Sequence, residues 1–422
     1  VPDDPISFMT LGTRWQLGRS VSRSNFVVAD VGRKVKVTVN KVRVEKKIGR
    51  QVLSFETGQI AKQAAGAVLV QYGETVVLVA AAGSKPRQGI DFFPLMCDYR
   101  ERFAAAGKYP GGFLKREGRP TTKEILSSRL MDRPIRPLWP EGYMNEVQVQ
   151  AFVLASDQQN DGDVLAMNGA GAALHISPLP FLGPIASVRV GKVDGEMVAF
   201  PTHAELEESE LDMIVSGSSK EVAMIEGFAN EMTEEQMMEA IQFAHGVIRD
   251  VIELQEELYQ KVNPQKVEYV VPEDDGLMDK VSSAYYDEFK SAMQVAGKQD
   301  RATAVSDLRD KAMADMIPDP EAEGAICTKR FKSVWHDLEG KVARDLIVAG
   351  IRSDGRDNTS LRQIHCETDI LPRVHGSAVF QRGETQAVIT VALVTSRDEQ
   401  RVDGLHDEFS KKFKMEYNFP SF

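Results

Sequence analysis

Gly66-Ala-Val-Leu-Val-Gln-Tyr-Gly-Glu-Thr75 returns 310 residues later as Gly376-Ser-Ala-Val-Phe-Gln-Arg-Gly-Glu-Thr385. Each copy runs into a second apolar stretch, so each predicts a β-hairpin with glycine in its turn. Solenoid repeats have periods of roughly 20–50 residues, and this much longer spacing therefore indicates a whole domain used twice. Because the second copy lies close to Phe422, we expect the chain to end inside the second domain.

The sequence between the hairpins predicts both helices and strands. Helical spacing covers 121–131, 163–175 and 234–260, and short apolar runs predict strands over 147–154, 185–190 and 211–216. Thr121 and Thr122 are candidate N-caps for the first helix, and Pro134 is its expected stop. Strands mixed with covering helices indicate an α+β or α/β core.

The composition of the chain changes near residue 264. Up to residue 345 the chain is rich in charge and poor in strand formers, and four apolar residues recur at helical spacing: Leu277, Val281, Tyr285 and Phe289. This pattern predicts an all-helical domain. We therefore expect four parts, namely a basic N-terminal extension, a first core, a helical domain and the start of a second core. Their bounds are 1–40, 41–263, 264–345 and 346–422.

Composition limits the possible functions. The chain has 422 residues, 42% hydrophobic and 27% charged, which is typical of a soluble globular protein of several domains. No apolar run approaches the roughly 20 residues of a membrane span, so we expect no membrane partner. The three cysteines lack metal-ligand spacing and predict reduced, mostly buried thiols in a cytoplasmic protein. A net charge of −11 disfavours nucleic-acid binding by the whole surface and requires a local basic site.

The N-terminal stretch is basic, with ten Lys or Arg against two acids in residues 6–47. Organellar targeting is one interpretation of such a segment. An extended reading frame or a fragment boundary is the other, because the chain begins Val-Pro-Asp-Asp-Pro without methionine.

Residues 115–136 hold a local excess of positive charge. Seven bases stand against three acids there: Lys115, Arg116, Arg119, Lys123, Arg129, Arg133 and Arg136. The last three recur at helical spacing and would share one face of a helix. Phe113 offers a ring beside these cations, and stacking combined with backbone-tracking cations is how proteins hold single-stranded nucleic acid. Salt bridges to Glu117, Glu124 and Asp132 are the structural alternative, but three acids cannot neutralise seven bases.

Two further motifs could carry chemistry. Asn160-Asp-Gly-Asp163 opens a predicted helix, where its aspartates are expected to act as caps and to repel phosphate. Arg373 and His375 flank the second hairpin, and Arg382 occupies the position of Tyr72 in the first copy; together they are a candidate phosphate-handling site. The sequence lacks Walker, HExxH and CxxC patterns, so nucleoside triphosphate hydrolysis and zinc chemistry have no support. We predict no metal ligands in this chain.

Several long motifs resemble the polynucleotide phosphorylase (polyribonucleotide nucleotidyltransferase) family. They are Phe113-Leu-Lys-Arg-Glu-Gly-Arg-Pro, Arg129-Leu-Met-Asp-Arg-Pro-Ile-Arg-Pro, Arg352-Ser-Asp-Gly-Arg356 and His375-Gly-Ser-Ala-Val-Phe-Gln-Arg-Gly-Glu-Thr-Gln386. The resemblance implies duplicated ribonuclease PH-like cores separated by an all-α domain, a homotrimeric ring, and possible partners in RNA-degradation complexes. It also implies degradation of single-stranded RNA from the 3′ end, with inorganic phosphate as co-substrate, nucleoside diphosphates as products and Mg²⁺ or Mn²⁺ as cofactor.

The resemblance also implies roles for individual residues. Phe113, Lys115 and Arg116 match the family's RNA-gripping loop, and the arginines at 119, 129, 133 and 136 match family arginines near the active site. Arg373 and His375 match basic residues near the phosphate site, so with Arg382 they are the catalytic candidates. The family's phosphate-binding serines and metal carboxylates would lie beyond Phe422, so we expect this chain to be inactive by itself. The alternative function is a non-catalytic RNA-binding ring scaffold.

Overall fold

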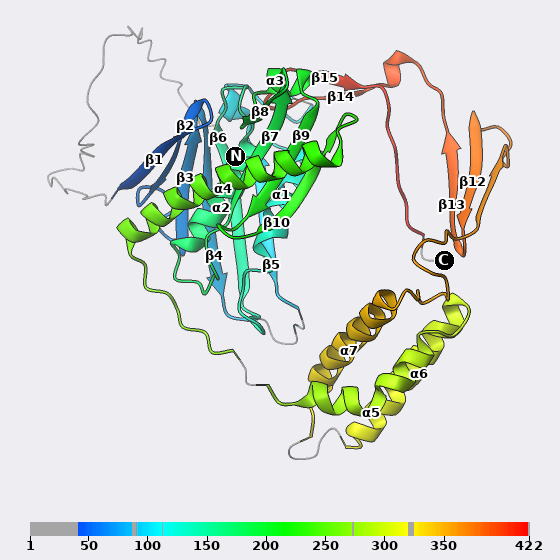
Figure 1. Ribbon diagram of the computed structural model, residues 1–422. Helices are drawn as coiled ribbons and strands as arrows, with labels where there is room; N and C mark the ends of the chain where they lie inside the picture. The colour runs from blue at the N-terminus through cyan, green and yellow to red at the C-terminus, as the bar shows by residue number, and fades with distance from the viewer. Residues whose placement is uncertain are drawn as a thin grey trace, which may run out of the picture. The chain divides into compact units, whose positions relative to one another are not determined.

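The computed structural model describes residues 41–86, 90, 92–111, 113–271, 274–319 and 325–420. The predicted basic extension, residues 1–40, lies outside them. Both copies of the repeat are β-hairpins, as predicted (Figure 1). In the first, β3 (Gly66–Tyr72) pairs with β4 (Thr75–Ser84); in the second, β12 (Gly376–Arg382) pairs with β13 (Thr385–Val391).

The first hairpin forms the centre of a six-stranded sheet. Its strand order is β1-β2-β3-β4-β6-β5, and every neighbouring pair is antiparallel except β5 and β6. The other four strands are β1 (Val42–Ile48), β2 (Gln51–Thr57), β5 (Leu95–Glu101) and β6 (Glu146–Ala155). Alternate residues of β3, β4 and β6 are buried, which is the pattern of a sheet with one face on the core.

A second sheet and two helices complete the first core. The sheet has the order β10-β9-β7-β8 and is antiparallel. Both α2 (Gly162–His175) and α4 (Glu234–Val262) contact strands of the two sheets (Figure 1). The remaining elements are α1 (Thr122–Ile135), β7 (Ala186–Val193), β8 (Glu196–Ala199), α3 (His203–Glu208), β9 (Leu211–Gly217) and β10 (Val222–Ala229).

Small residues let α2 approach the sheets closely. A Cβ built on Gly169 would lie 2.5 Å from Val79 Cγ2, and one on Gly171 would lie 2.2 Å from the Ile185 carbonyl oxygen. Asn168 makes the contact specific, because its side chain donates to the Ser187 carbonyl (2.9 Å) and accepts from the Ser187 amide (2.8 Å). These bonds satisfy an amide group that is fully buried.

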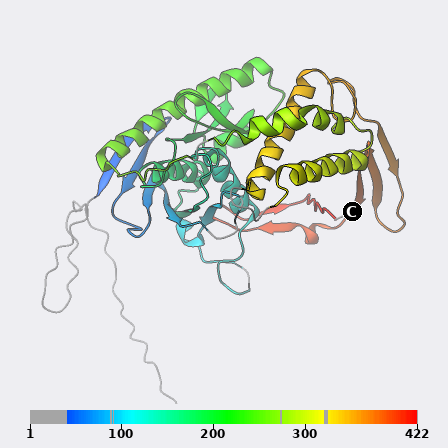
Figure 2. The ribbon, with the colours of Figure 1, turned by 90° about the horizontal axis from the view of Figure 1, so that it is seen from below.

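Three helices form a region with a hydrophobic core of its own: α5 (Leu277–Ala292), α6 (Lys298–Met316) and α7 (Thr328–Val348). Figure 2 shows them side by side, in yellow to orange. The four buried residues of α5 are the four that the helical spacing predicted. They pack in the same cluster as Phe331, Trp335 and Leu338 of α7.

The remainder of the described chain is β-rich and exposed. β11 (Ile364–Thr368) pairs with β12, and β14 (Gln400–Val402) pairs with β15 (Phe409–Lys411). Cys366 on β11 and Cys327 before α7 are exposed. The prediction of mostly buried thiols was therefore wrong, because an edge strand and a helix start give a side chain little cover. No helix of the described residues is long and apolar enough to span a bilayer.

Candidate nucleic-acid interface

The loop between β5 and α1 projects Phe113 away from the core. Its side chain is 98% exposed and that of Leu114 is 75% exposed. Lys115 has φ +49°, in the left-handed region that few residues other than glycine adopt. A phenylalanine ring usually stabilises a protein because it is buried, and the ring of Phe113 is not buried. The ring is therefore free to stack on a planar ligand.

The start of α1 is fixed to the end of β5. Thr121 accepts from the Glu124 amide through Oγ1 (3.2 Å), and Glu124 accepts from the Thr121 amide (2.6 Å), which forms a capping box. The Glu124 carboxylate also accepts from the Glu101 amide (2.9 Å). Thr121 is the N-cap, as predicted, but Pro134 lies inside the last turn instead of beyond the helix.

Two of the α1 arginines have carboxylate partners. Arg133 pairs with Glu226, which comes from β10 and was not considered as a partner in the sequence. Arg136 binds both oxygens of Asp132, at 2.7 and 2.6 Å, and donates to the carbonyls of Phe93 (3.2 Å) and Leu95 (3.1 Å). These contacts tie α1 to the strand beside it, so Arg136 has a structural role whatever else it binds.

Of the other five bases, Lys123 pairs with Glu101 (2.8 Å) and Asp161 (3.0 Å), and the remaining four have no acidic partner among the described residues. Glu117 accepts from the Phe103 amide (3.2 Å), and Glu124 is engaged with backbone amides, so neither neutralises a nearby arginine. Within the described part of the chain, no ion pair involves four exposed bases, which we call the basic cluster: Lys115, Arg116, Arg119 and Arg129. Uncompensated cations beside an exposed ring suit a polyanion with planar groups.

The second-core candidates lie at two places. Arg373 (φ +76°) and His375 precede β12, and the His375 Nδ1 accepts from the Leu393 amide (2.8 Å). Arg382 is the last residue of β12, so the length of the strand separates it from His375 by roughly 20 Å. The structure therefore brings Arg373 and His375 together and leaves Arg382 at the other end, where one phosphate cannot reach both groups.

Charged residues fill the N-terminal end of α2. Asp161 is the N-cap residue, but its side chain makes no capping hydrogen bond; it faces Lys123 (3.0 Å) and Arg189 (3.6 Å). Arg189 also pairs with Asp163 (3.2 Å) and Asp212 (2.7 Å). Asp163 does cap the helix, because its Oδ1 accepts from the Val164 amide (2.6 Å) in the first turn. Asp161 occupies the N-cap position, but its carboxylate faces cations from α1 and β7, which are stronger partners than amides. Arg189 was not identifiable as a partner from the sequence, because it lies 26 residues beyond Asp163 on β7.

Burial and neighbouring charge shift the pKa values of this pair in opposite directions. Burial and the adjacent Asp161 carboxylate raise the pKa of Asp163 to about 6. Burial alone would raise the pKa of Asp161 too, but Lys123 and Arg189 lower it to about 2. A phosphate would meet an ionised carboxylate at this helix end, and a divalent cation would have to displace Lys123 and Arg189. The residues present therefore do not fit either ion.

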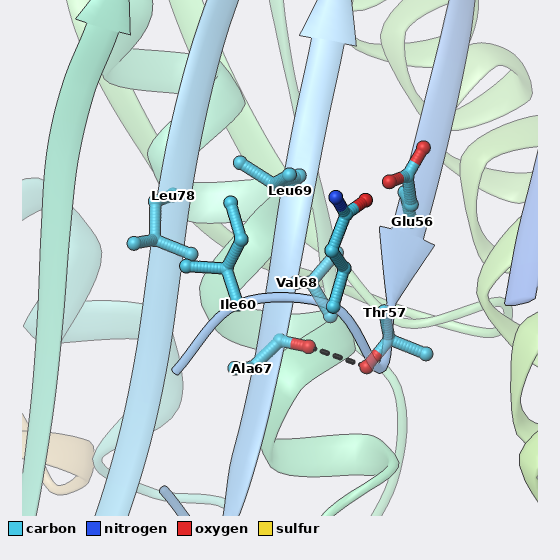
Figure 3. A pocket seen from close by; sticks show the side chains of 8 residues that line it. Glu56, Thr57, Ile60, Ala67, Val68, Leu69 and Leu78 are labelled. Carbon is cyan, nitrogen blue, oxygen red and sulfur yellow. Dashed lines mark hydrogen bonds between the residues drawn. The ribbon is translucent and has the colours of Figure 1, made fainter. Parts of the chain in front are cut away.

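The depression between β2, β3 and β4 offers no better site. Among the described residues, no group of three or more His, Cys, Asp or Glu side chains is arranged to hold a metal ion. Figure 3 shows a depression on the sheet, where Ile60 lies over Leu69 and Leu78 and the Thr57 hydroxyl donates to the Ala67 carbonyl (2.6 Å). Its few polar groups are already bonded or exposed, and it has no space for a water molecule.

Family models match most of the chain. The model for the 3′ exoribonuclease family, domain 1, matches residues 50–180 and again 360–422, which confirms the duplication predicted from the hairpins. Domain 2 of that family matches 183–247. The RNA-binding domain of polyribonucleotide nucleotidyltransferase matches 276–357, the span that contains the three helices.

The curated relatives that match the chain are polyribonucleotide nucleotidyltransferases. A polyribonucleotide nucleotidyltransferase of Rhodopirellula baltica is 75% identical over 386 residues, 92% of this chain and 51% of the relative. This chain belongs to the polyribonucleotide nucleotidyltransferase family. Members from Sorangium cellulosum and Geobacter sulfurreducens are 47% and 44% identical, over 90% and 92% of this chain and 51% and 55% of the relatives. The chain thus spans about half the length of the curated polyribonucleotide nucleotidyltransferases it matches.

Proposed function

We propose that the protein takes part in 3′-to-5′ phosphorolytic degradation of single-stranded RNA, as in mRNA turnover, and that its first core binds the RNA. Family membership supports the reaction, and the basic cluster with the exposed Phe113 supports the binding. The observation that carries this proposal is the absence of any ion pair at Lys115, Arg116, Arg119 and Arg129 among the described residues. RNA phosphates would supply the missing negative charge.

In the proposed reaction, inorganic phosphate attacks the phosphorus of the 3′-terminal phosphodiester. The bond to the 3′ oxygen of the penultimate nucleotide breaks, that oxygen takes a proton, and a nucleoside diphosphate leaves. In this scheme the arginines of the basic cluster hold the RNA backbone and Phe113 stacks on a base. The roles of Arg373, His375 and Arg382 in phosphate handling stay predictions, now divided between the two ends of β12.

Three finer proposals come from the resemblance. Mg²⁺ or Mn²⁺ is proposed for the complete enzyme only, since the described residues do not fit a divalent ion. A homotrimer, with possible partners in RNA degradation, and a location in the cytoplasm are likewise proposals. The second candidate function is a non-catalytic RNA-binding ring scaffold, favoured by the neutralised charges at the start of α2.

RNA binding is tested by replacing Lys115 and Arg116 together with alanine. Because each phosphate contact releases counterions, the double variant should bind poly(A) more weakly and with a slope of log affinity against log salt that is about 1–2 units smaller. The matched control is Lys62→Ala with Lys85→Ala, which removes two other exposed cations of the first core that have no ion pair among the described residues. Equal affinity and slope in the loop variant and the wild type would exclude this loop as the RNA-binding site.

The reaction is tested by phosphate-dependent release of nucleoside diphosphate from poly(A). A complete relative should release nucleoside diphosphate, whereas the 422-residue chain should bind poly(A) but release none. That result would support our prediction that this chain alone is inactive. Poly(A) binding without phosphorolysis by any complete relative would favour the scaffold function. Robust release by the 422-residue chain would contradict the expected inactivity.

A further inference from the structure

The connection between β14 and β15 is packed on the first core. Leu405 in its middle is only 4% exposed and belongs to the same hydrophobic cluster as the first-core strands and α2. The residues after it, Asp407 and Glu408, are exposed. We call residues 403–406 the docking segment.

Hydrogen bonds hold the backbone of the docking segment. Lys108 donates through Nζ to the carbonyl of Gly404 (3.3 Å) and also to the carbonyl of His406. Gln158 donates through Nε2 to the Leu405 carbonyl (2.9 Å). Three successive carbonyls, which have no strand partner, thus accept from first-core side chains. Each such bond to an otherwise unpaired backbone group stabilises the contact.

The docking segment contacts the start of the loop that carries Phe113 and shares a cavity with its end. At the start of the loop, a Cβ on Gly111 would lie 2.4 Å from Asp403 Oδ2, so the backbone and the carboxylate are in close contact. At its end, Glu117 and Arg119 line one side of a cavity of about 50 Å³, and residues 403–405 line another. The loop tip between these ends is exposed.

A ring contact completes the packing. The imidazole of His406 lies edge-on to that of His203 at the start of α3, with ring centroids 4.2 Å apart. The charged groups near these rings are two cations, Lys123 and Arg189, and three carboxylates, Asp157, Asp161 and Glu101. Burial is the main cause that lowers the pKa of each imidazole, so both rings are neutral at pH 7.

We propose that the docking segment is a positioning element for RNA binding: it clamps the base of the loop and thereby fixes the direction in which Phe113, Lys115 and Arg116 project. This inference rests on the proposed function, because a fixed loop direction helps only if the loop binds RNA. An unclamped loop would have to be ordered when RNA binds, and that entropy cost would lower the affinity. The clamp comes from a distant part of the chain, because Gly404 lies 296 residues after its hydrogen-bond partner Lys108.

The first test measures loop order directly, without RNA. Leu405→Ala is compared with the wild type, and Leu361→Ala is the matched control because the same truncation there affects a side chain that is 85% exposed. Amide hydrogen exchange of residues 103–120 should become about tenfold faster in Leu405→Ala only. Amides of β9 should not change, which shows that the core is folded. Leu405→Met should restore slow exchange.

A second variant leaves the hydrophobic core intact. Lys108→Met removes the contacts to Gly404 and His406 and should also accelerate exchange in the loop. Lys62→Met removes the same charge from an exposed residue and should not. If neither Leu405→Ala nor Lys108→Met changes exchange in residues 103–120, the clamp does not exist.

The third measurement links the clamp to RNA. Leu405→Ala should weaken poly(A) binding about three- to tenfold, and less than additively when combined with Lys115→Ala and Arg116→Ala, because both changes act through one loop. Strict additivity would overturn the positioning role even if the loop loosens. If Lys115→Ala with Arg116→Ala leaves poly(A) binding unchanged, the proposed RNA site is refuted, whatever Leu405→Ala does to the loop. Failure of the clamp and failure of the RNA site therefore give different results.

Discussion

The two hairpins have the same local geometry and different surroundings. Gly66 pairs with Ala81 and Gly376 with Val391, so the registers are identical after the 310-residue offset. Both turns begin at a glycine with φ near +60°, and in both the preceding glutamine donates to that glycine's carbonyl at 3.0 Å. Ten residues and a glycine that tolerates a positive φ therefore suffice to specify the hairpin.

Burial separates the two copies. Val70 and Val79 are fully buried, whereas their counterparts Phe380 and Ile389 are 39% and 43% exposed. The cause is α2, which covers the first hairpin and touches it closely enough that Gly66 has no space for a side chain. The same strand pattern is thus compatible with a core position or an exposed one, and the neighbouring helix decides which it takes.

Exchanging Tyr72 and Arg382, the residues that distinguish the two hairpins, should have the largest effect on hairpin stability. The Tyr72 hydroxyl donates to the Ile48 carbonyl (3.0 Å) and accepts from the Gln51 amide (3.3 Å) in a buried environment. Tyr72→Arg would bury an unpaired charge and should lower the free energy of opening of the first hairpin by about 3–5 kcal/mol. Arg382→Tyr should change it by less than about 0.5 kcal/mol. Hydrogen exchange of each hairpin measures both, and equal effects would refute the role of burial.

Adding one methyl group to each copy tests the helix contact. A Cβ on Gly66 would lie 2.1 Å from the Ala173 carbonyl oxygen, which is backbone and cannot move aside, whereas one on Gly376 would lie 3.5 Å from Val391 Cβ. Gly66→Ala should destabilise the first hairpin by about 2–3 kcal/mol. Gly376→Ala should be neutral or slightly stabilising. Calorimetric melting of both variants checks the difference, and an unchanged Gly66→Ala would mean that α2 does not contact the hairpin this closely.

Removing the shared turn bond should affect the copies alike. Gln71→Ala and Gln381→Ala each delete one side-chain hydrogen bond to a turn glycine. Each should accelerate amide exchange of its own hairpin by an amount equivalent to about 0.5–1.5 kcal/mol. A much larger effect in the first copy would show that burial strengthens this bond as well.

Acidification should act on the first core alone, and weakly. Burial lowers the pKa of His203 and of His406, so at these two rings the unfolded chain binds a proton more readily than the folded one, and their contribution to stability is lost as pH falls below about 6.5. Asp163, with its pKa raised to about 6, acts with the opposite sign in the same range and reduces the net effect. Both rings are partly exposed, which limits the effect. Exchange in residues 103–120 should be a few-fold faster at pH 5.5 than at pH 7.5 after correction for intrinsic rates, and His406→Phe should reduce that change, because only His203 of the pair is then left to take up a proton. The exchange of β12 should not respond.

Much of the fold was predictable because its signals are local. Helix α5 followed from four apolar residues at helical spacing, and the start of α1 from Thr121 followed by Glu124 three residues later. The basic cluster was visible as an excess of charge. Its composition was only partly predictable, because Arg133 finds Glu226 on a strand that is 93 residues away. The capping prediction for Asp161 and Asp163 missed their ion pairs for the same reason, since Arg189 comes from β7.

The sequence by itself determined the duplicated hairpins, the helical region and the presence of an unneutralised group of bases, because each depends on residues within a few positions of one another. Only the tertiary structure decided which copy of the hairpin is buried, which arginines already have partners, and that residues 403–406 hold the loop of Phe113. Those outcomes depend on contacts between segments far apart in the chain. Pairwise contacts of that kind leave no periodicity or spacing in a single sequence. They can therefore be identified only in the folded structure, where the partners lie side by side.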